Sequence, residues 1–317
     1  MTRIERTALG RTGLQVSRIG FGAMELRGPF GSPGRPADHA SAAALLHAVL
    51  DAGINFIDTS PDYGESEELI GEALASRRDE FVLASKCGCP CGTVQQRTLG
   101  ASAHDYTRAN IRRGVEDSLR RLRTDRLDLL QVHLSPARAV LERDDTLGEL
   151  QRLQREGKVR FIGMSGTLPH LRDHIAMQCF DVFQVPYSAM APEHHDMIAK
   201  AAQAGAGIIV RGAVWRGLPF FHSGPLARIV QVLRKAIGRP DQWQASGLGD
   251  LLQGIPVREF LLRFTLSHPG QSTTIVGTSN AAHLAANVEA AAKGPLPADV
   301  YAQALRRVAN ATRGPRA

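Results

Sequence analysis

Phe56-Ile57-Asp58-Thr59-Ser60-Pro61-Asp62-Tyr63-Gly64 is the stretch in which a short apolar run ends at a carboxylate, a turn and a phenol. The apolar residues Ile54, Phe56 and Ile57 are typical of a short buried strand, and the proline and glycine that follow indicate a loop. From residue 65 to residue 74 the apolar positions have helical spacing. Asp58 and Tyr63 therefore lie between a strand and a helix. Taken alone, they fit an ordinary turn as well as a chemical site, since loops favour aspartate.

The same order of strand and helix recurs along the chain. Strand-like apolar runs lie near residues 19–21, 55–57, 81–84, 127–132, 161–164, 182–185, 208–210 and 273–276. Helical patterns lie near residues 39–52, 66–76, 107–121, 146–156, 168–177, 193–204, 257–266 and 281–292. Because the strands lack a polar face, this alternation predicts a parallel sheet covered by helices. Eight such units predict a (β/α)8 TIM barrel.

An open, doubly wound sheet is the competing architecture. It would use a G-x-G-x-x-G turn after its first strand, but residues 20–22 supply only the first two glycines of that motif. The segment around Gly10 to Gly13 predicts a small hairpin before the barrel. Residues 28–36 and 212–254 have the composition of loops, and the second gives a long loop after the seventh strand. No linker divides the chain, so we expect one domain over residues 1–317.

Composition excludes several classes of protein. The chain of 317 residues is 43% hydrophobic, but no apolar run approaches the length of a membrane span, and the first residues lack the apolar core of a signal peptide. The net charge of +7 is scattered, and only 5% of residues are aromatic, which argues against nucleic-acid binding. Four cysteines are too few for a disulfide framework in a chain of this length. We therefore expect a cytoplasmic protein with no nucleic-acid or membrane partner.

Polar residues follow nearly every predicted strand. In strand order from the second to the eighth they are Asp58, Ser85 with Lys86, His133, Ser165, Gln184, Arg211, and Gly277 with Thr278 and Ser279. Each one alone is more often a solvated or packed residue than a functional one. Their joint position is informative, because the active sites of barrels of this type lie at the carboxyl ends of the strands.

Lys86 is the most informative of these residues, since the chain contains only five lysines. At the mouth of a barrel a partly desolvated lysine needs a carboxylate partner, which Asp58 on the adjacent strand can supply. A cation beside Tyr63 is also expected to favour the phenolate and lower the pKa of the tyrosine from about 10. His133, one strand further on, could hydrogen-bond a carbonyl oxygen held by Tyr63.

With these residues in place, the chain resembles the aldo-keto reductase superfamily from Leu9 to about Asn287. The segments that carry the resemblance are residues 9–14, 19–24, 53–64, 85–86, 125–133, 157–165 and 277–287. The resemblance implies a barrel that binds NADPH across its carboxyl-terminal mouth. It also implies a catalytic tetrad that falls on Asp58, Tyr63, Lys86 and His133. In that mechanism a hydride from the nicotinamide reaches a substrate carbonyl while Tyr63 supplies the proton, Lys86 paired with Asp58 tunes Tyr63, and His133 orients the carbonyl.

The resemblance also implies the residues that contact the cofactor. Ser165 and Gln184 would bind the carboxamide, and Tyr187 would stack on the nicotinamide. The remaining contacts would come from Arg211, Gly212, Ala213, Trp215 and Gly217 near the pyrophosphate, and from Gly277, Thr278, Ser279, His283 and Asn287 around the adenosine phosphate.

The chain departs from the family pattern at two cofactor positions. Gly166 stands where an asparagine is usual, so one amide contact to the nicotinamide is missing or moved. Thr278-Ser279-Asn280 stands where many members place an arginine or lysine for the 2′-phosphate. Hydroxyl groups, backbone N–H groups at the start of the last helix and His283 could hold that phosphate instead. We therefore expect NADPH rather than NADH.

A third departure is the cluster Cys87-Gly88-Cys89-Pro90-Cys91 directly after Lys86. It lacks the C-x-x-C spacing usual for zinc, and no matching pair of His or Cys follows at a plausible interval, so we expect no metal site. Reduced thiols in a loop are the expected state, because cytoplasmic thiols stay reduced. A redox switch beside Lys86 is the alternative, and assays with diamide and after thiol reduction test it.

The leading functional hypothesis is an NADPH-dependent oxidoreductase that reduces an aldehyde or ketone, a small-molecule carbonyl substrate, to an alcohol. The alternative is an NADPH-binding regulatory or sensor subunit with little turnover. The intact tetrad and the lack of an appended interaction domain argue against the alternative. Substrate identity and oligomeric state stay open, because the two long loops that would set specificity are the least regular parts of the sequence.

Overall fold

The computed structural model describes residues 4–26, 38–92, 104–214 and 242–313. Within these residues the strands are β1 (Arg6–Ala8), β2 (Gln15–Ser17), β3 (Ile19–Gly22), β4 (Phe56–Asp58), β5 (Val82–Cys87), β6 (Leu127–Val132), β7 (Val159–Ser165), β8 (Val182–Pro186), β9 (Gly207–Arg211) and β10 (Thr273–Val276). Strands β3 to β10 close into a parallel barrel in the order β10-β3-β4-β5-β6-β7-β8-β9. The predicted (β/α)8 barrel is therefore confirmed.

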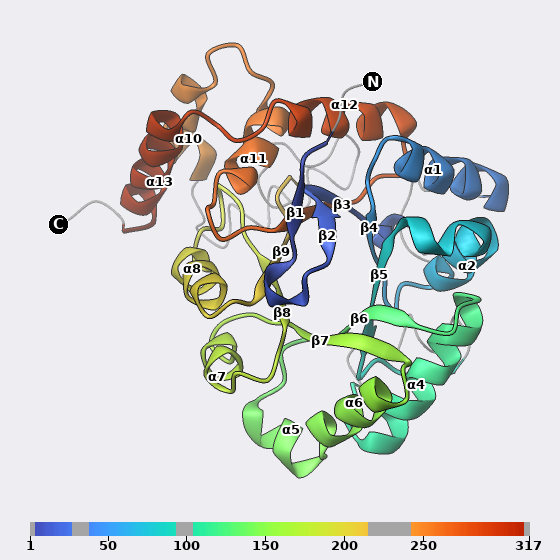
Figure 1. The fold of residues 1–317 in the computed structure, drawn as a ribbon. Coiled ribbons are helices and arrows are strands. Elements are labelled where there is room, and N and C mark those ends of the chain that lie inside the picture. Colours follow the sequence, from blue (N-terminus) through green and yellow to red (C-terminus); the bar gives the residue numbers. More distant parts are fainter. Residues whose placement is uncertain (1–3, 27–37, 93–103, 215–241, 314–317) are drawn as a thin grey trace, which may run out of the picture.

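Helices surround this barrel and cover its outer face (Figure 1). They are α1 (His39–Asp51), α2 (Ser66–Leu74), α4 (Arg108–Arg121), α5 (Arg138–Arg143), α6 (Thr146–Arg155), α7 (Leu171–Ala176), α8 (His195–Gln203), α10 (Gln242–Ser246), α11 (Val257–Leu266), α12 (Ala281–Ala292) and α13 (Ala298–Arg313). Each predicted helix overlaps one of these. Helices α5, α10 and α13 were not predicted from the sequence.

The predicted N-terminal hairpin is also confirmed, and it closes the amino-terminal end of the barrel. Strands β1 and β2 pair antiparallel, and Figure 1 shows them in front of the barrel strands. Leu9 and Val16 of the hairpin pack against interior residues of the barrel. Gly10 approaches β9 so closely that a Cβ there would lie 2.1 Å from the backbone nitrogen of Gly207. A side chain at either glycine would push the hairpin off the barrel.

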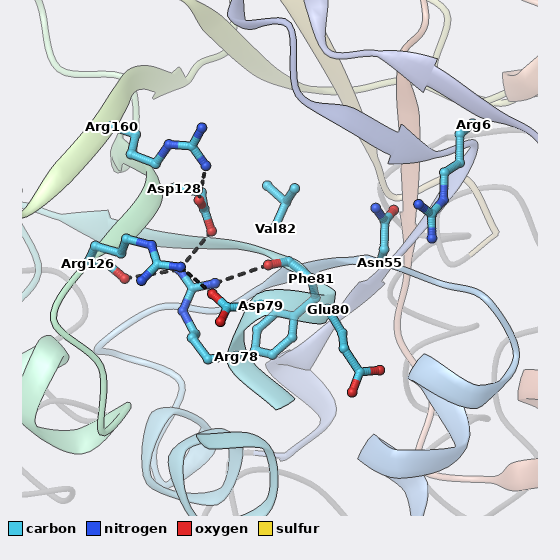
Figure 2. Close-up of a pocket in the computed structure, with 10 residues that line it drawn as sticks. All are labelled: Arg6, Asn55, Arg78, Asp79, Glu80, Phe81, Val82, Arg126, Asp128 and Arg160. Atoms are coloured by element: carbon cyan, nitrogen blue, oxygen red, sulfur yellow. Dashed lines mark hydrogen bonds and ion pairs between the residues drawn. The ribbon is translucent and has the colours of Figure 1, made fainter. Parts of the chain in front are cut away.

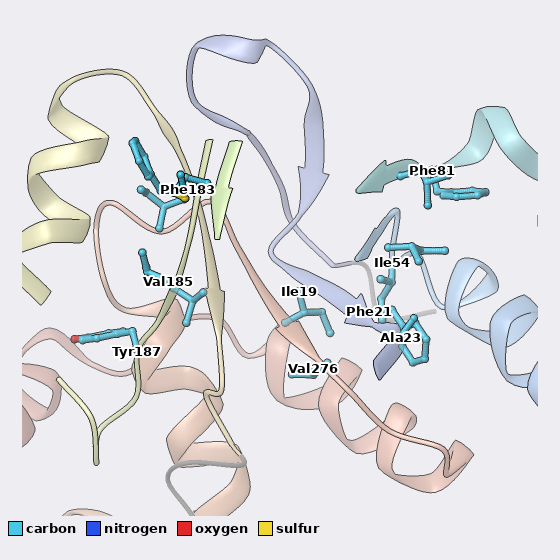
Figure 3. Packing of buried hydrophobic residues seen from close by; sticks show 14 of the residues in the cluster. Ile19, Phe21, Ala23, Ile54, Phe81, Phe183, Val185, Tyr187 and Val276 are labelled. Carbon is cyan, nitrogen blue, oxygen red and sulfur yellow. The ribbon is translucent and has the colours of Figure 1, made fainter. Parts of the chain in front are cut away.

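Two apolar layers hold the barrel, and the alternation of side chains along each strand assigns residues to them. The interior layer includes Phe56, Val82, Ala84, Leu129, Val182 and Ile209. The larger layer lies between the strands and the helices. In Figure 3, Phe183, Val185 and Tyr187 lie in a row along β8, and all three belong to this outer layer. Because side chains on a strand alternate between the two layers, a residue two positions after an interior residue also faces the interior.

The long segment after the seventh barrel strand, β9, is described only in part. Residues 212–214 and 242–254 are described, and they include α10 and a 3-10 helix at Leu248–Leu251. Leu248 and Leu251 are buried in the outer layer. The second half of this loop thus packs as part of the helical shell.

Candidate active site

The centre of the site is a buried ion pair at the carboxyl-terminal end of the barrel. Asp58 follows Phe56, and Lys86 follows Ala84, so both side chains continue the interior face of their strands. Lys86 Nζ donates hydrogen bonds of 2.8 Å to Asp58 Oδ2 and to the backbone oxygen of Thr59. Both side chains are at most 2% exposed. The structure therefore brings together the pair expected from the sequence.

Two glutamines complete the contacts of Asp58. Gln131 Nε2 and Gln184 Nε2 each donate a hydrogen bond of 2.8 Å to Asp58 Oδ1. The buried carboxylate thus accepts three side-chain hydrogen bonds, which offsets the cost of removing its charge from water. The sequence analysis did not single out Gln131. Its position two residues after the interior Leu129 is the signal that could have found it.

Tyr63 lies in the loop after β4, where its ring faces both Lys86 and His133. Lys86 Nζ is 4.9 Å from the centroid of the Tyr63 ring. The rings of Tyr63 and His133 meet edge to face, with centroids 6.3 Å apart. His133 follows β6 and is in phase with Gln131. The four predicted residues Asp58, Tyr63, Lys86 and His133 therefore form one cluster.

The electrostatics of the cluster follow from its burial. Burial lowers the pKa of Lys86, but the charges of Asp58 and Tyr63 outweigh this and hold that pKa above its ordinary value. The pKa of Tyr63 is raised, because burial and the two neighbouring carboxylates outweigh Lys86 and Arg211. The expectation that Lys86 would lower the pKa of Tyr63 was therefore wrong in its net direction. Tyr63 carries its proton at neutral pH, as a proton donor requires.

The predicted carboxamide contacts lie beside this cluster. Ser165 Oγ donates to Gln184 Oε1 at 3.2 Å, and the backbone N–H of Gly166 donates to the Gln184 carbonyl at 3.0 Å. A Cβ at Gly166 would lie 3.0 Å from a methyl group of Leu171 and 3.2 Å from Met164. An asparagine at this position would therefore require the Leu171 and Met164 side chains to shift.

The residues expected at the adenosine end lie at the start of α12. Asn280 caps this helix, because its Oδ1 accepts from the Ala282 N–H at 2.8 Å. Thr278 is buried and its hydroxyl accepts from the Asn280 N–H. His283 is exposed and Asn287 is half-buried one helical turn later. Strand β10, which leads into this segment, pairs with β9, which ends at Arg211.

The remaining residues expected to bind the cofactor lie in the helical layer, directly after β9 or outside the described residues. Tyr187 is buried in the helical layer, where its hydroxyl hydrogen-bonds His195 and Tyr301 and its ring stacks on Phe264. Stacking of Tyr187 on a nicotinamide stays a prediction. Gly212 and Ala213 directly follow β9, while Trp215 and Gly217 lie outside the described residues.

A sequence model of the Aldo/keto reductase family matches residues 18–306 of this chain. The chain belongs to the aldo-keto reductase family. Membership makes it an oxidoreductase of a family that uses nicotinamide nucleotides and acts on small carbonyl compounds.

Individual relatives agree with this membership. The chain is 29% identical to L-galactose dehydrogenase of Arabidopsis thaliana over 302 residues, 92% of this chain and 89% of that protein. It is 32% identical to the aldo-keto reductase YhdN of Bacillus subtilis over 221 residues, 68% of this chain and 63% of that protein. The holo form of aldo-keto reductase AKR11C1 from Bacillus halodurans superposes with a TM-score of 0.77 at 26% identity, with 96% of both chains covered.

The cysteines of this aldo-keto reductase are free thiols. Cys87 belongs to β5 rather than to the following loop, and burial raises its pKa to about 12. Burial also raises the pKa of Cys89 well above its ordinary value. Because the thiolate is the reactive form, neither residue is suited to fast oxidation, and the environment argues against the redox switch.

A pocket of about 200 Å³ lies at the opposite end of the barrel, around the start of β5. Figure 2 shows that charged side chains line it and pair with one another. Arg78 and Arg160 both bind Asp128, whose Oδ2 also accepts from the backbone N–H of Leu83. The amino-terminal end of a barrel contributes to stability rather than to catalysis, and these groups pair with each other. We therefore place the active site at the other mouth.

Among the described residues, the aldo-keto reductase has no helix with the length and apolar character needed to cross a membrane.

Proposed function

We propose that this aldo-keto reductase uses NADPH to reduce the carbonyl group of an aldehyde or ketone, with Tyr63 as the proton donor. The observation that carries the proposal is the position of Lys86 Nζ, 4.9 Å from the centre of the Tyr63 ring and 2.8 Å from Asp58 Oδ2. A fixed cation beside a phenol stabilises the negative charge that develops on its oxygen as the proton leaves.

Each residue of the cluster has a role in this reaction. Tyr63 holds the proton that the substrate oxygen receives. Lys86 stabilises the phenolate left behind, and Asp58 keeps Lys86 charged and in place. His133, whose ring meets that of Tyr63, donates a hydrogen bond that orients the substrate carbonyl. These groups are aligned before the substrate arrives, so little reorganisation is needed during the reaction.

The residues at this mouth fit a nicotinamide dinucleotide. When bound, the cofactor supplies the hydride. Ser165 and Gln184 offer the hydroxyl and amide that a carboxamide requires, next to Asp58. Arg211 and the start of the twelve-residue helix α12 follow neighbouring strands, and a guanidinium and a helix N-terminus both favour phosphate groups. Hydroxyl groups of Thr278 and Ser279, with His283, would hold the 2′-phosphate that distinguishes NADPH from NADH.

The decisive experiment replaces Tyr63 by phenylalanine. We expect Tyr63→Phe to lower kcat for carbonyl reduction by a factor of about 10² to 10⁴, the usual contribution of a positioned acid. The Kd for NADPH, measured by quenching of tryptophan fluorescence, should change little. Tyr301→Phe is the matched control, because Tyr301 lies in the helical layer and is expected to keep full kcat. Full activity of Tyr63→Phe would refute the proposed role.

Substrates are best found by following NADPH absorbance with aldehydes, ketones, quinones and sugars. The panel should include L-galactose with NADP⁺, because one relative is named for oxidation of that sugar. Tight binding of NADPH without turnover on any compound would instead support the regulatory or sensor subunit.

A further inference from the structure

Four side chains from distant parts of the sequence converge beside the catalytic cluster. Asp62 lies in the loop after β4, Cys89 and His104 lie in the segment between β5 and α4, and His133 follows β6. One ligand atom from each lies within 4.8 Å of the ligand atoms of the other three. Cys89 and His133 are buried, and the side chains of His104 and Asp62 are 4% and 8% exposed.

Four of the six separations between these ligand atoms are close to the edges of a zinc tetrahedron. His133 Nδ1 lies 3.3 Å from Cys89 Sγ, 3.3 Å from His104 Nε2 and 3.4 Å from Asp62 Oδ2. His104 Nε2 lies 3.8 Å from Asp62 Oδ2. Metal–ligand distances of about 2.0–2.3 Å place tetrahedral zinc ligands about 3.3–3.7 Å apart. These four separations thus fit side chains that share one ion.

Hydrogen bonding alone accounts poorly for this arrangement. Three groups face one ring nitrogen of His133, and a neutral imidazole nitrogen has either one proton or one lone pair to share. Only one of the three contacts can therefore be a normal hydrogen bond at a time. A cation at the centre would satisfy all four side chains together.

We propose that Asp62, Cys89, His104 and His133 bind a zinc ion. A thiolate, two imidazoles and a carboxylate are all ligand types that zinc binds in proteins, usually in tetrahedral arrangement. The charges balance, because a thiolate and a carboxylate neutralise a divalent ion. Binding exchanges the Cys89 thiol proton for the metal, the proton passes to solvent, and no group is oxidised or reduced.

The surroundings support the ligands. Ser60 Oγ donates to Asp62 Oδ1, the oxygen that does not face His133, at 2.6 Å and lies 3.4 Å from Cys89 Sγ. Gly88 has a φ of +83°, and a Cβ there would lie 2.5 Å from the Tyr106 ring. Tyr106 in turn donates to the His133 carbonyl at 2.7 Å. This packing fixes the turn that presents Cys89 to His133. Such outer contacts orient metal ligands in known sites.

Because four protein ligands fill the coordination shell, the ion would be a structural one that does not bind substrate. Its ligation of Nδ1 would leave the proton of the neutral His133 ring on Nε2. If the proposed function holds, that proton is the one offered to the substrate carbonyl. The ion would therefore set the tautomer of a catalytic residue while joining the loops after β4 and β5 to β6.

The sequence analysis expected no metal site because the cysteine spacing lacks a local zinc motif. In the structure the ligands come from four separate positions, and only one of the three clustered cysteines, Cys89, takes part. Spacing within Cys87–Cys91 therefore does not bear on this site.

The test measures metal binding directly and does not depend on activity. Full-length protein, stripped with a chelator under reducing conditions, is titrated with Zn²⁺ against a chromophoric competitor, and we expect one ion per chain. Co²⁺ should give the visible absorption of a tetrahedral site and a thiolate-to-cobalt charge-transfer band. Failure to bind zinc at this stoichiometry, or cobalt spectra of an octahedral site, would overturn the proposal while leaving the reductase function untouched.

Variants locate the site. Cys89→Ser and His104→Gln should each weaken zinc binding at least about a hundredfold, since even outer-shell changes cost 10- to 100-fold. Cys91→Ser is the matched control, because that thiol lies in the same loop but faces Asn110. It should retain both zinc and the charge-transfer band. Equal loss in Cys91→Ser, or unchanged binding in Cys89→Ser and His104→Gln, would place the metal elsewhere and refute this site.

Discussion

Asp58 places a negative charge inside the barrel, and this charge raises the pKa of Lys86. Among the influences that raise the pKa of Lys86, the charge of Asp58 is the largest, and it opposes the lowering by burial. The amides of Gln131 and Gln184 hold the other carboxylate oxygen, so its orientation is fixed. Lys86 therefore remains a cation next to Tyr63 over the whole physiological range of pH.

Asp58→Asn tests this positioning role. Without the carboxylate, burial dominates and the pKa of Lys86 should fall, so the lysine loses its charge at a lower pH than in the native enzyme. We expect the rate of carbonyl reduction at pH 7 to fall at least about tenfold, and its alkaline decline to move to lower pH. Stopped-flow rates across pH 6–10 measure both effects.

Asp79→Asn serves as the control, because that carboxylate is 88% exposed and pairs only at the surface. Its pH profile should superimpose on that of the native enzyme. If the profile of Asp58→Asn does so too, Asp58 has no influence on Lys86.

The sequence was sufficient to predict that Asp58, Lys86 and His133 lie close together, because each is a polar residue that follows a predicted strand. The strand ends did not reveal Gln131, which lies inside the predicted strand at 127–132 rather than after it. The phase of each strand would have supplied it: counting in twos from Leu129 leads inward to Gln131 and His133. Counting in twos from Val182 reaches Gln184 and leaves Tyr187 on the outer face, where the structure places it.

Among the elements, α2 is held to its neighbours by one buried carboxylate. Glu67 is fully buried and accepts from Ser85 of β5, from Ser118 of α4 and from Arg121 at the end of α4. The Arg121 side chain is 15% exposed. A single charge thus connects a strand with two helices in the layer behind Lys86.

We expect Arg121→Ala to lower the free energy of unfolding by about 3 kcal/mol, because the substitution leaves the buried charge of Glu67 without its counter-ion. Arg120→Ala is the neighbouring control. Its side chain is 74% exposed, and the change should stay within about 0.5 kcal/mol. Urea unfolding of both variants measures the difference. Equal changes in the free energy of unfolding for the two variants would show that Arg121 does not stabilise the buried charge of Glu67.

Element positions were predictable where apolar spacing was regular, and they were missed where it was not. Helix α5 has six residues, of which only Leu141 is buried, so its pattern is too short to detect. Helix α13 follows the last unit of the barrel, where the alternation of strand and helix gives no guide. The cluster of Asp62, His104 and His133 could not be predicted, because only the closed barrel brings these three segments together.

For the whole molecule, buried histidines connect stability to pH. His268 lies between α11 and β10, donates from Nε2 to the His195 carbonyl at 3.1 Å and accepts from the Gly270 N–H at 3.0 Å. Nδ1 can accept the second bond only while the ring is neutral, so protonation would break it. Burial and the neighbouring His195 lower the pKa of His268 to about 4, although Asp196 acts in the opposite direction.

This shift predicts loss of stability in acid. The unfolded chain binds a proton at His268 below about pH 6.5, whereas the folded chain does so only near pH 4. The contribution is therefore complete above pH 6.5 and is lost as the pH falls toward 4. By pH 5 about 2 kcal/mol of this contribution is lost. Burial lowers the pKa of His174 as well, which adds to the same trend.

The free energy of unfolding in urea should fall between pH 7.5 and pH 5, and it should fall less for His268→Gln than for the native enzyme. His39→Gln is the control, since that side chain is 63% exposed. A difference that His268→Gln leaves unchanged would assign the acid sensitivity to other groups.

The seam of the barrel has a consequence for how the protein is made. In the closed barrel, β3 pairs with β4 on one side and with β10 on the other. The pairing with β10 joins Ile19 to Thr274 and Phe21 to Val276. During synthesis, β3 therefore keeps an unpaired edge until nearly the whole chain has left the ribosome. Such edges pair readily with other chains, and contacts of large sequence separation form slowly. Cells that produce this enzyme quickly would benefit from chaperones that cover the nascent half-barrel until its last strand arrives.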